Sequence, residues 1–290
     1  MENTESQPKI VRTAIERIRN IHTLPEIAIR IRELLDDPEC TADKVDQLIC
    51  TDPALSARIL RVVNSSFYGM PGQFSSVKRA VIFLGLNAIK NITIAASLNK
   101  MFKAHPAMPN FHAEDLWMHS VAVGVLSQQI ALRAGNVASD DAFLAGLIHD
   151  VGIIVELQAC RNEFAEVLKR CSKDKDLTLR EAESQVFGVT HEEFGAELCR
   201  AWRFPGQLVD VTSRHHNPET LPEHSRIMPR IVHLADLLAN KAGKHAAPGA
   251  EGKVITSDLL DKVGVTIDDL SLIAKELPDR IAEVKQVYTA

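Results

Sequence analysis

The chain has 290 residues, 46% hydrophobic and 24% charged, which excludes a disordered, collagen-like or coiled-coil protein as a description of the whole. Its 33 basic and 38 acidic residues give a formal net charge of −5, which argues against a dedicated nucleic-acid-binding protein. The five cysteines include no C-x-x-C pair, so neither a disulfide framework nor a cysteine-based zinc site is expected.

The first twenty residues are too polar for a signal peptide, and we treat them as an N-terminal extension. No uninterrupted apolar run reaches the roughly 18 residues that a membrane span requires. We therefore expect a soluble, cytoplasmic protein that does not enter a membrane.

Residues 21–105 form the first helical part. Apolar residues recur at helical spacing over residues 27–35, 45–49 and 55–63, and capping residues precede these stretches at Thr23, Thr41 and Asp52. A loop is expected at residues 68–73, followed by an apolar helix that Ser76 opens. Residues 104–110 carry two prolines and little periodicity, so we place a boundary there.

Residues 106–244 form the second helical part, and residues 245–290 comprise a mobile loop (residues 245–253) and two short closing helices. No alternating strand pattern exceeds about four residues. The chain is therefore predicted to be all-α. Within the second part, helical patterns cover residues 113–134, 139–157, 161–173, 178–187, 191–202, 205–216 and 224–243.

Histidines and aspartates interrupt several of these apolar helices. An ionised carboxylate or unpaired imidazole in such surroundings costs several kcal/mol unless a partner compensates, and a metal ion is one such partner. Asp115 lies one turn before His119 and could reach the same centre. The interrupting residues are His149, Asp150 and Asp236. Further candidates are His119 within an amphipathic helix, His191 at the start of a helix, and the doublet His215 and His216 at a helix end.

Each of these residues also has a structural explanation. A lone histidine on a helix is more often a hydrogen-bonded core residue than a ligand, the doublet could cap a helix, and Asp236 could pair with an arginine. His233 is hard to dismiss because it lies one turn before Asp236. The remaining histidines are assigned to the surface: His22, His105, His112, His224 and His245.

The order of these residues resembles a known superfamily. Residues 145–152, AGLIHDVG, resemble the central signature of the HD metal-dependent phosphohydrolases. Four further segments resemble the HDOD family, the HD-related output domain of bacterial signalling proteins. They are LPEI (24–27), TDPALSARILRVVNSSFYG (51–69), SVKRAVIFLGLNAI (76–89) and HEEFGAELCRAWRFPGQLVDVTSRHH (191–216).

This resemblance implies an HD-type helical core, preceded by the helical subdomain of HDOD proteins. It also implies a dinuclear centre of divalent transition metals, iron or manganese, with Asp150 as the bridging carboxylate. His216 and Asp115 match positions that the related HD-GYP phosphodiesterases use for a further metal. The full implied ligand set is His119, His149, Asp150, His191, His215 and Asp236, with His216 and Asp115 as additions.

Two departures from the HD-GYP pattern concern substrate binding. Those enzymes carry a phosphate-contacting lysine soon after the HD doublet, whereas residues 152–155 here are Gly-Ile-Ile-Val. Their Gly-Tyr-Pro loop after the histidine doublet is replaced by Asn-Pro-Glu-Thr-Leu-Pro at residues 217–222. Arg214 or Arg133 could substitute for the missing cation.

Two functions remain open. The first is a regulatory module that binds a protein partner through the surface around Phe67 and Tyr68, unless these rings only fill the junction between the two helical parts. The second is a phosphohydrolase acting on a nucleotide or cyclic dinucleotide, in which Asp150 is central and His216 protonates the leaving oxygen. No nucleic-acid partner is expected, because basic residues neither form runs nor alternate with aromatic residues.

Overall fold

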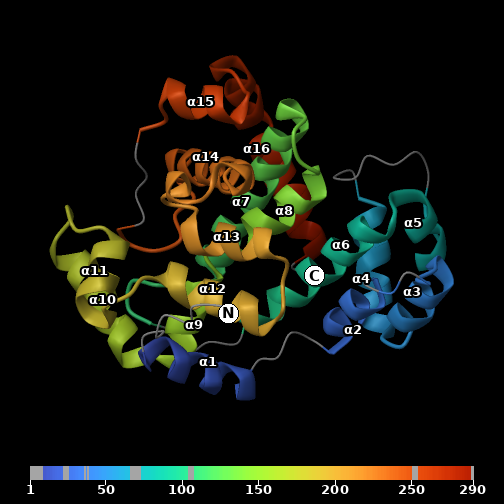
Figure 1. Cartoon of the computed structure of the whole chain (residues 1–290), viewed down its shortest axis with the longest axis horizontal. Helices are drawn as coiled ribbons and strands as arrows, with labels where there is room; N and C mark the ends of the chain where they lie inside the picture. The colour runs from blue at the N-terminus through green and yellow to red at the C-terminus, as the bar shows by residue number, and fades with distance from the viewer. Residues whose placement is uncertain are drawn as a thin grey trace.

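The computed structural model describes residues 9–21, 26–35, 37, 39–65, 73–103, 108–249 and 254–288, and these are folded entirely as helices, turns and loops (Figure 1). Within these ranges the only β-type pairing is an isolated bridge between Met108 and Phe111. The predicted all-α class is confirmed. The predicted capping residue Thr23 and the residues Phe67 and Tyr68 lie outside the described ranges.

The first helical part is a small bundle at one end of the molecule (right in Figure 1). Its helices start where the sequence predicts, because Thr41, Asp52 and Ser76 each accept a hydrogen bond from a backbone N–H of the first turn. Its members are α2 (Glu26–Leu35), α3 (Ala42–Ile49), α4 (Pro53–Val63), α5 (Val77–Leu84) and α6 (Leu86–Lys103).

The N-terminal extension contains helix α1 (Lys9–Ile21), which packs against α9 (Val151–Ala159) and α12 (His191–Ala201) of the second part. Val11, Ala14 and Ile15 are buried there. Arg17 donates a hydrogen bond from Nη1 to the carbonyl oxygen of Ala159 over 2.9 Å. The extension therefore belongs structurally to the second helical part, from which it is distant in sequence.

Helix α7 (Ala113–Ala134) is the centre of the second part and packs against α8, α14 and α16. The structure corrects one predicted helix: residues 139–157 form two helices that are separated by a turn at residues 149–150. The described helices of this part are α7, α8 (Ser139–Ile148), α9, α10 (Arg161–Lys173), α11 (Leu179–Phe187), α12, α13 (Gly206–Arg214) and α14 (Ile227–Lys241), with 3₁₀ turns at Pro218–Thr220 and Glu223–Ser225.

Helices α9 and α12 approach each other closely at a glycine. A Cβ atom on Gly152 would collide with the carbonyl oxygen of His191 and would lie 2.7 Å from the backbone nitrogen of Gly195. Only glycine allows this approach. The contact fixes the turn at residues 149–150 against the start of α12.

The C-terminal region differs from the prediction of two short helices. Helix α15 (Ser257–Val263) is short, but α16 (Ile267–Tyr288) has 22 residues and contacts both α7 and α4. Its apolar stripe continues past Pro278, which explains why the helix does not end there. The buried members of that stripe are Leu270, Ile273, Leu277, Ile281 and Val284.

The loop predicted as mobile at residues 245–253 is packed over its described part. Ala246 and Ala247 are buried, and the carbonyl oxygen of Gly249 accepts a hydrogen bond from the Leu179 backbone over 3.0 Å. Residues 250–253 lie outside the described ranges.

One stretch of the described residues, Ser139–Ala159, is long and apolar enough to cross a membrane. However, 94% of its most apolar window is buried within the protein, as is usual for the core helices of a soluble protein.

Candidate metal centre

The carboxylate of Asp150 lies at the turn between α8 and α9 and is surrounded by imidazoles. The turn matters because it ends α8 at Ile148 and points the side chains of His149 and Asp150 into the protein. Their residues are 0% and 5% exposed. The two oxygens of Asp150 face two different groups of residues.

Oδ2 of Asp150 faces the first group. It lies 3.2 Å from Nε2 of His149 and 3.5 Å from Nε2 of His119. Nε2 of His119 is also 3.3 Å from Oδ1 of Asp236. His119 comes from α7, Asp236 comes from α14, and His149 and Asp150 come from the turn between α8 and α9. Three separate parts of the chain therefore meet at this point.

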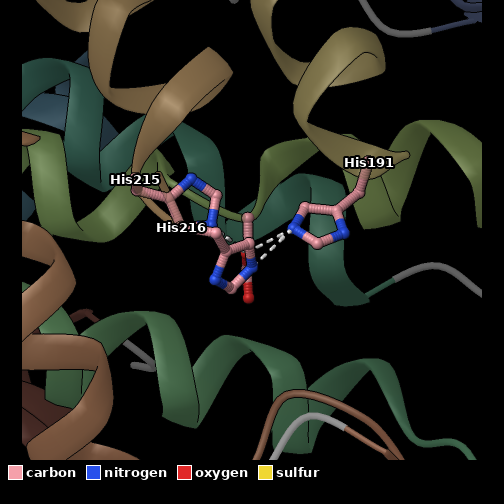
Figure 2. Close-up of side chains that lie close together, drawn as sticks. His191, His215 and His216 are labelled. Carbon is pink, nitrogen blue, oxygen red and sulfur yellow. Dashed lines mark hydrogen bonds and ion pairs between the residues drawn. The ribbon is translucent and has the colours of Figure 1, made fainter. Parts of the chain in front are cut away.

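Oδ1 of Asp150 faces the second group. It lies 3.4 Å from Nε2 of His191 and 3.3 Å from Nε2 of His215. His216 completes this group, with its Nε2 atom 3.3 Å from Nε2 of His191. Figure 2 shows the imidazoles of His191, His215 and His216 converging on one another from two different helix ends.

Hydrogen bonds on the outer nitrogens orient four of the imidazoles. The Nδ1 atoms of His119, His149 and His215 lie 2.7, 2.7 and 3.1 Å from the carbonyl oxygens of Lys244, Gly146 and Val211. Nδ1 of His191 lies 2.9 Å from a carboxylate oxygen of Glu183. Because each Nδ1 faces an acceptor, it carries a proton, and the Nε2 atom of each ring is directed toward Asp150.

These residues fit a pair of divalent transition metals. Oδ1 of Asp150 and Nε2 of His215 are buried and make no hydrogen bond with the described residues. A buried acceptor without a partner destabilises the folded protein unless a bound ligand interacts with it. Neutral imidazole nitrogen and carboxylate oxygen are donors that iron, manganese and zinc all accept. One carboxylate between two imidazole groups also has the form of a bridging ligand.

Burial and neighbouring charges shift the pKa values of Asp150 and His191. Burial opposes the charge of Asp150, but the neighbouring His149, His215 and His191 hold its pKa well below the usual range. Burial alone would lower the pKa of His191, yet Glu183 and Asp150 raise this pKa to about 10. A protonated Nε2 cannot bind a metal, so metal binding at His191 must release a proton.

His216 behaves differently. Burial, together with His215 and His191, lowers the pKa of His216 well below its usual value. The lowered pKa favours the neutral form of the ring. A neutral imidazole is a good ligand and a poor proton donor, which favours a metal-binding role over the predicted protonation of a leaving group.

The centre opens into a cavity of about 540 Å³. This volume falls within the range of small-molecule sites. From the centre, His119, Asp150, His191, His216 and Asp236 line it, and His233 lies beside them. The other lining residues come from the first turns of α11, together with Thr190, Leu237, Ala246 and Gly249.

Asp115 is the one predicted addition that the structure leaves apart from the cluster. It is exposed in the first turn of α7 and lines a neighbouring cavity of about 570 Å³ with His112 and His245. Asp115 does share a helix face with His119, but it lies one turn nearer the surface, and the ring of His119 is turned toward Asp150. The surface assignments of His112, His224 and His245 are confirmed, whereas His22 and His105 lie outside the described residues.

The substitutes proposed for the missing phosphate-binding cation do not line the cavity. Arg214 is exposed and bonds to the carbonyl of Ser213, and Arg133 lies 3.8 Å from Asp269. Residues 152–155 are buried within α9. A different arginine, Arg180, lines the cavity instead.

Sequence analysis missed three functional side chains beside the cluster. Glu183 binds both Nδ1 and the backbone N–H of His191, Glu156 is fully buried near Glu183, and Arg180 reaches the cavity. Burial and the proximity of Glu183 raise the pKa of Glu156 well above its usual value. The available signal was the Thr178 capping box, which fixes where α11 begins.

Comparison with known proteins agrees with this geometry. The family model described as the HDOD domain matches residues 21–218, more than half of the chain. The chain belongs to the HDOD family. An HDOD domain protein of unknown function from Geobacter sulfurreducens has the same fold, with a TM-score of 0.75 and 26% identity over 96% of this chain and 99% of that one.

Two further crystal structures share the fold. One is a proposed signal transduction protein from Marinobacter aquaeolei VT8, with a TM-score of 0.75 and 23% identity over 97% of this chain and 65% of that one. The other is a proposed phosphohydrolase from Shewanella amazonensis SB2B, with a TM-score of 0.71 and 20% identity over 95% and 98%.

A curated relative, an uncharacterized protein from Treponema pallidum (strain Nichols), is 24% identical over 230 residues. The matched region is 79% of this chain and 44% of that protein, so the chain spans less than half the length of the relative.

Proposed function

We propose that this HDOD protein is a signal-transduction module whose core binds two divalent transition-metal ions, iron or manganese. The observation that carries the metal centre is the position of Asp150, whose Oδ1 faces His191 and His215 and whose Oδ2 faces His119 and His149. Asp236 would complete the site at Oδ2, and His216 would complete the site at Oδ1. Glu183 and three backbone carbonyls keep the ligand nitrogens correctly oriented.

Elemental analysis tests this centre. Protein purified without a chelator or an affinity tag should contain about two equivalents of transition metal. Asp150→Asn keeps the shape of the side chain but removes its charge, and it should abolish most of this metal. Asp261→Ala, at an exposed position of α15, is the matched control and should retain it. Folded wild-type protein that takes up no added iron, manganese or zinc would contradict the proposal.

A regulatory role is supported by the separation of the centre from the first helical part. None of the described residues that line the cavity comes from α2–α6. Helix α5 exposes Ile82 and Phe83, which are 67% and 59% accessible. Burial of these two side chains against a protein partner would be favourable.

A pull-down with wild-type protein and with an Ile82→Ser/Phe83→Ser variant tests this role. A partner that the variant no longer retains, at unchanged metal content and melting temperature, supports a regulatory surface on α5. An identical set of retained proteins argues against it.

The cavity favours a second candidate function, hydrolysis of a phosphoester in a nucleotide or cyclic dinucleotide. Paired metals supply a hydroxide nucleophile and neutralise charge on phosphorus when they are bound. The chain supplies the enclosed volume and a fixed array of imidazoles. The apolar wall of Leu179, Leu237 and Ala246 would hold the rest of a substrate away from water.

Turnover of bis(p-nitrophenyl) phosphate, p-nitrophenyl phosphate and a nucleotide panel tests catalysis. Hydrolysis by metal-loaded protein should be lost in Asp150→Asn and retained in Asp261→Ala. Equal rates in wild type and Asp150→Asn would assign the activity to a contaminant. A metal-loaded protein that hydrolyses nothing in the panel would leave the regulatory function as the conclusion.

A further inference from the structure

Arg180 is the one arginine or lysine among the described residues that line the metal cavity. It is the second residue of α11, whose start is fixed by a capping box between Thr178 and Glu181. The cap holds the first turn of α11 against the cavity. Arg180 is therefore carried by a rigid element rather than by a loop.

A buried carboxylate holds one edge of the guanidinium. Oε2 of Glu192 accepts hydrogen bonds from Nε and Nη2 of Arg180, over 2.8 and 2.6 Å. The side chain of Glu192 is 3% exposed, whereas that of Arg180 is 32% exposed. Nη1 of Arg180 has no hydrogen bond to a described residue, so both of its N–H groups remain available to a ligand.

This guanidinium lies on the His191 side of the centre. Glu192, its anchor, directly follows His191 in the chain. When the amide of Asn217 is oriented to satisfy both of its polar atoms, its oxygen accepts from Nη2 of Arg180 over 3.3 Å and its nitrogen donates to the carbonyl of His216 over 3.0 Å. Glu192 thus links Arg180 to His191, and Asn217 links it to His216.

We propose that Arg180 binds an oxyanion of a phosphate group in this cavity through Nη1, beside the metal site formed by His191, His215 and His216. The inference rests on the proposed metal centre and names its ligand class: a phosphomonoester or phosphodiester. Arginine is suited to this role because its planar fork matches phosphate oxygens and keeps its charge at every physiological pH. It would supply the cation that residues 152–155 lack.

The competing explanation is that Arg180 and Glu192 form only a structural ion pair. The two explanations differ in the effect of Glu192→Gln. If Arg180 binds phosphate, removing the carboxylate leaves the guanidinium charge uncompensated, and phosphate binds at least as tightly. If the pair is only structural, Glu192→Gln and Arg180→Gln damage the same contact and weaken phosphate binding alike.

Calorimetric titration of the metal-loaded full chain with inorganic phosphate tests the proposal. Arg180→Gln should raise the dissociation constant by about tenfold to a hundredfold, as expected for one charge-assisted contact. Arg180→Lys should restore part of the affinity. The double variant Arg180→Gln/Glu192→Gln leaves no unpaired buried charge and should bind as weakly as Arg180→Gln. Arg214→Gln, at an exposed arginine outside the cavity, is the matched control and should bind like wild type.

Phosphate affinity in Arg180→Gln within twofold of wild type overturns the role of Arg180. So does a Glu192→Gln variant that loses as much affinity as Arg180→Gln. Metal content measured on the same samples separates this inference from the proposed function. Wild-type protein without metal contradicts the metal centre, whereas equal phosphate binding by fully loaded wild type and Arg180→Gln contradicts only the phosphate contact.

Discussion

Gly152 of α9 lies directly against the carbonyl oxygen of His191, so closely that no side chain fits between them. The contact joins the helix that follows Asp150 to the helix that begins with His191. It therefore sets the distance between the carboxylate of Asp150 and one of the imidazoles that face it. The geometry of the proposed metal centre therefore depends on Gly152, a residue that has no side chain to offer a metal.

Gly152→Ala should consequently reduce both stability and metal content. The added methyl group must push α9 and α12 apart, and overpacking of this kind typically costs about 1–3 kcal/mol. Urea unfolding and metal analysis measure the two effects. Gly206→Ala is the control, because a Cβ at that position meets nothing within 4 Å. Full metal content in a folded Gly152→Ala protein would show that the centre tolerates this displacement.

Glu183→Gln should weaken metal binding by about tenfold to a hundredfold, which is typical of outer hydrogen-bond partners of metal ligands. The carboxylate accepts from both the ring and the backbone of His191, and an amide can satisfy only part of this. Competition with a fluorescent chelator measures the affinity. Glu166→Gln, on the exposed face of α10, should leave it unchanged. An unchanged affinity in Glu183→Gln would mean that His191 is oriented by packing alone.

Glu156 should make the protein less stable as pH rises. Its pKa in the folded protein is raised well above the ordinary value of 4.5 by burial and by Glu183, so the folded state keeps a proton that the unfolded state releases. The folded state binds more protons, and the free energy of unfolding falls as pH increases from about 4.5 toward the raised pKa.

Glu156→Gln should remove this pH-dependent loss, so the variant should gain stability over wild type as pH increases. Urea unfolding of both proteins at several pH values checks the sign. A difference between the two proteins that is constant with pH would show that Glu156 does not titrate in this range.

Metal removal should destabilise the wild type specifically. A ligand that binds only the folded state adds about 2.7 kcal/mol when its free concentration is a hundred times the dissociation constant. EDTA should therefore lower the melting temperature of wild-type protein and have little effect on Asp150→Asn. Equal shifts in the two proteins would indicate that the stabilising ion lies elsewhere.

Much of the fold could be predicted from the sequence. Helical periodicity and capping residues located most helices to within a few residues, including the starts at Thr41, Asp52 and Ser76. The break at residues 149–150 could not be predicted from periodicity, because apolar residues continue on both sides of it. The length of α16 was not predictable from its local sequence, because Pro278 lies inside it and a proline usually marks the end or a kink of a helix.

The candidate ligands were predictable because a polar residue inside an apolar helix needs a partner. The division of these ligands into two groups could not be predicted, because only the tertiary structure shows which histidines face each oxygen of Asp150. Glu156 and Glu183 escaped notice because acidic residues in a helix are usually solvated. Arg180 escaped notice because nothing in its local sequence distinguishes it from a surface arginine.

Three of the four oriented imidazoles rely on the peptide carbonyls of Lys244, Gly146 and Val211. Substitution at these positions changes a side chain but cannot delete the acceptor. Mutational drift can therefore alter much of the sequence around the centre while the rings keep their tautomers. For His191 alone the orienting group is encoded by a side chain, and a single codon change at Glu183 can remove it.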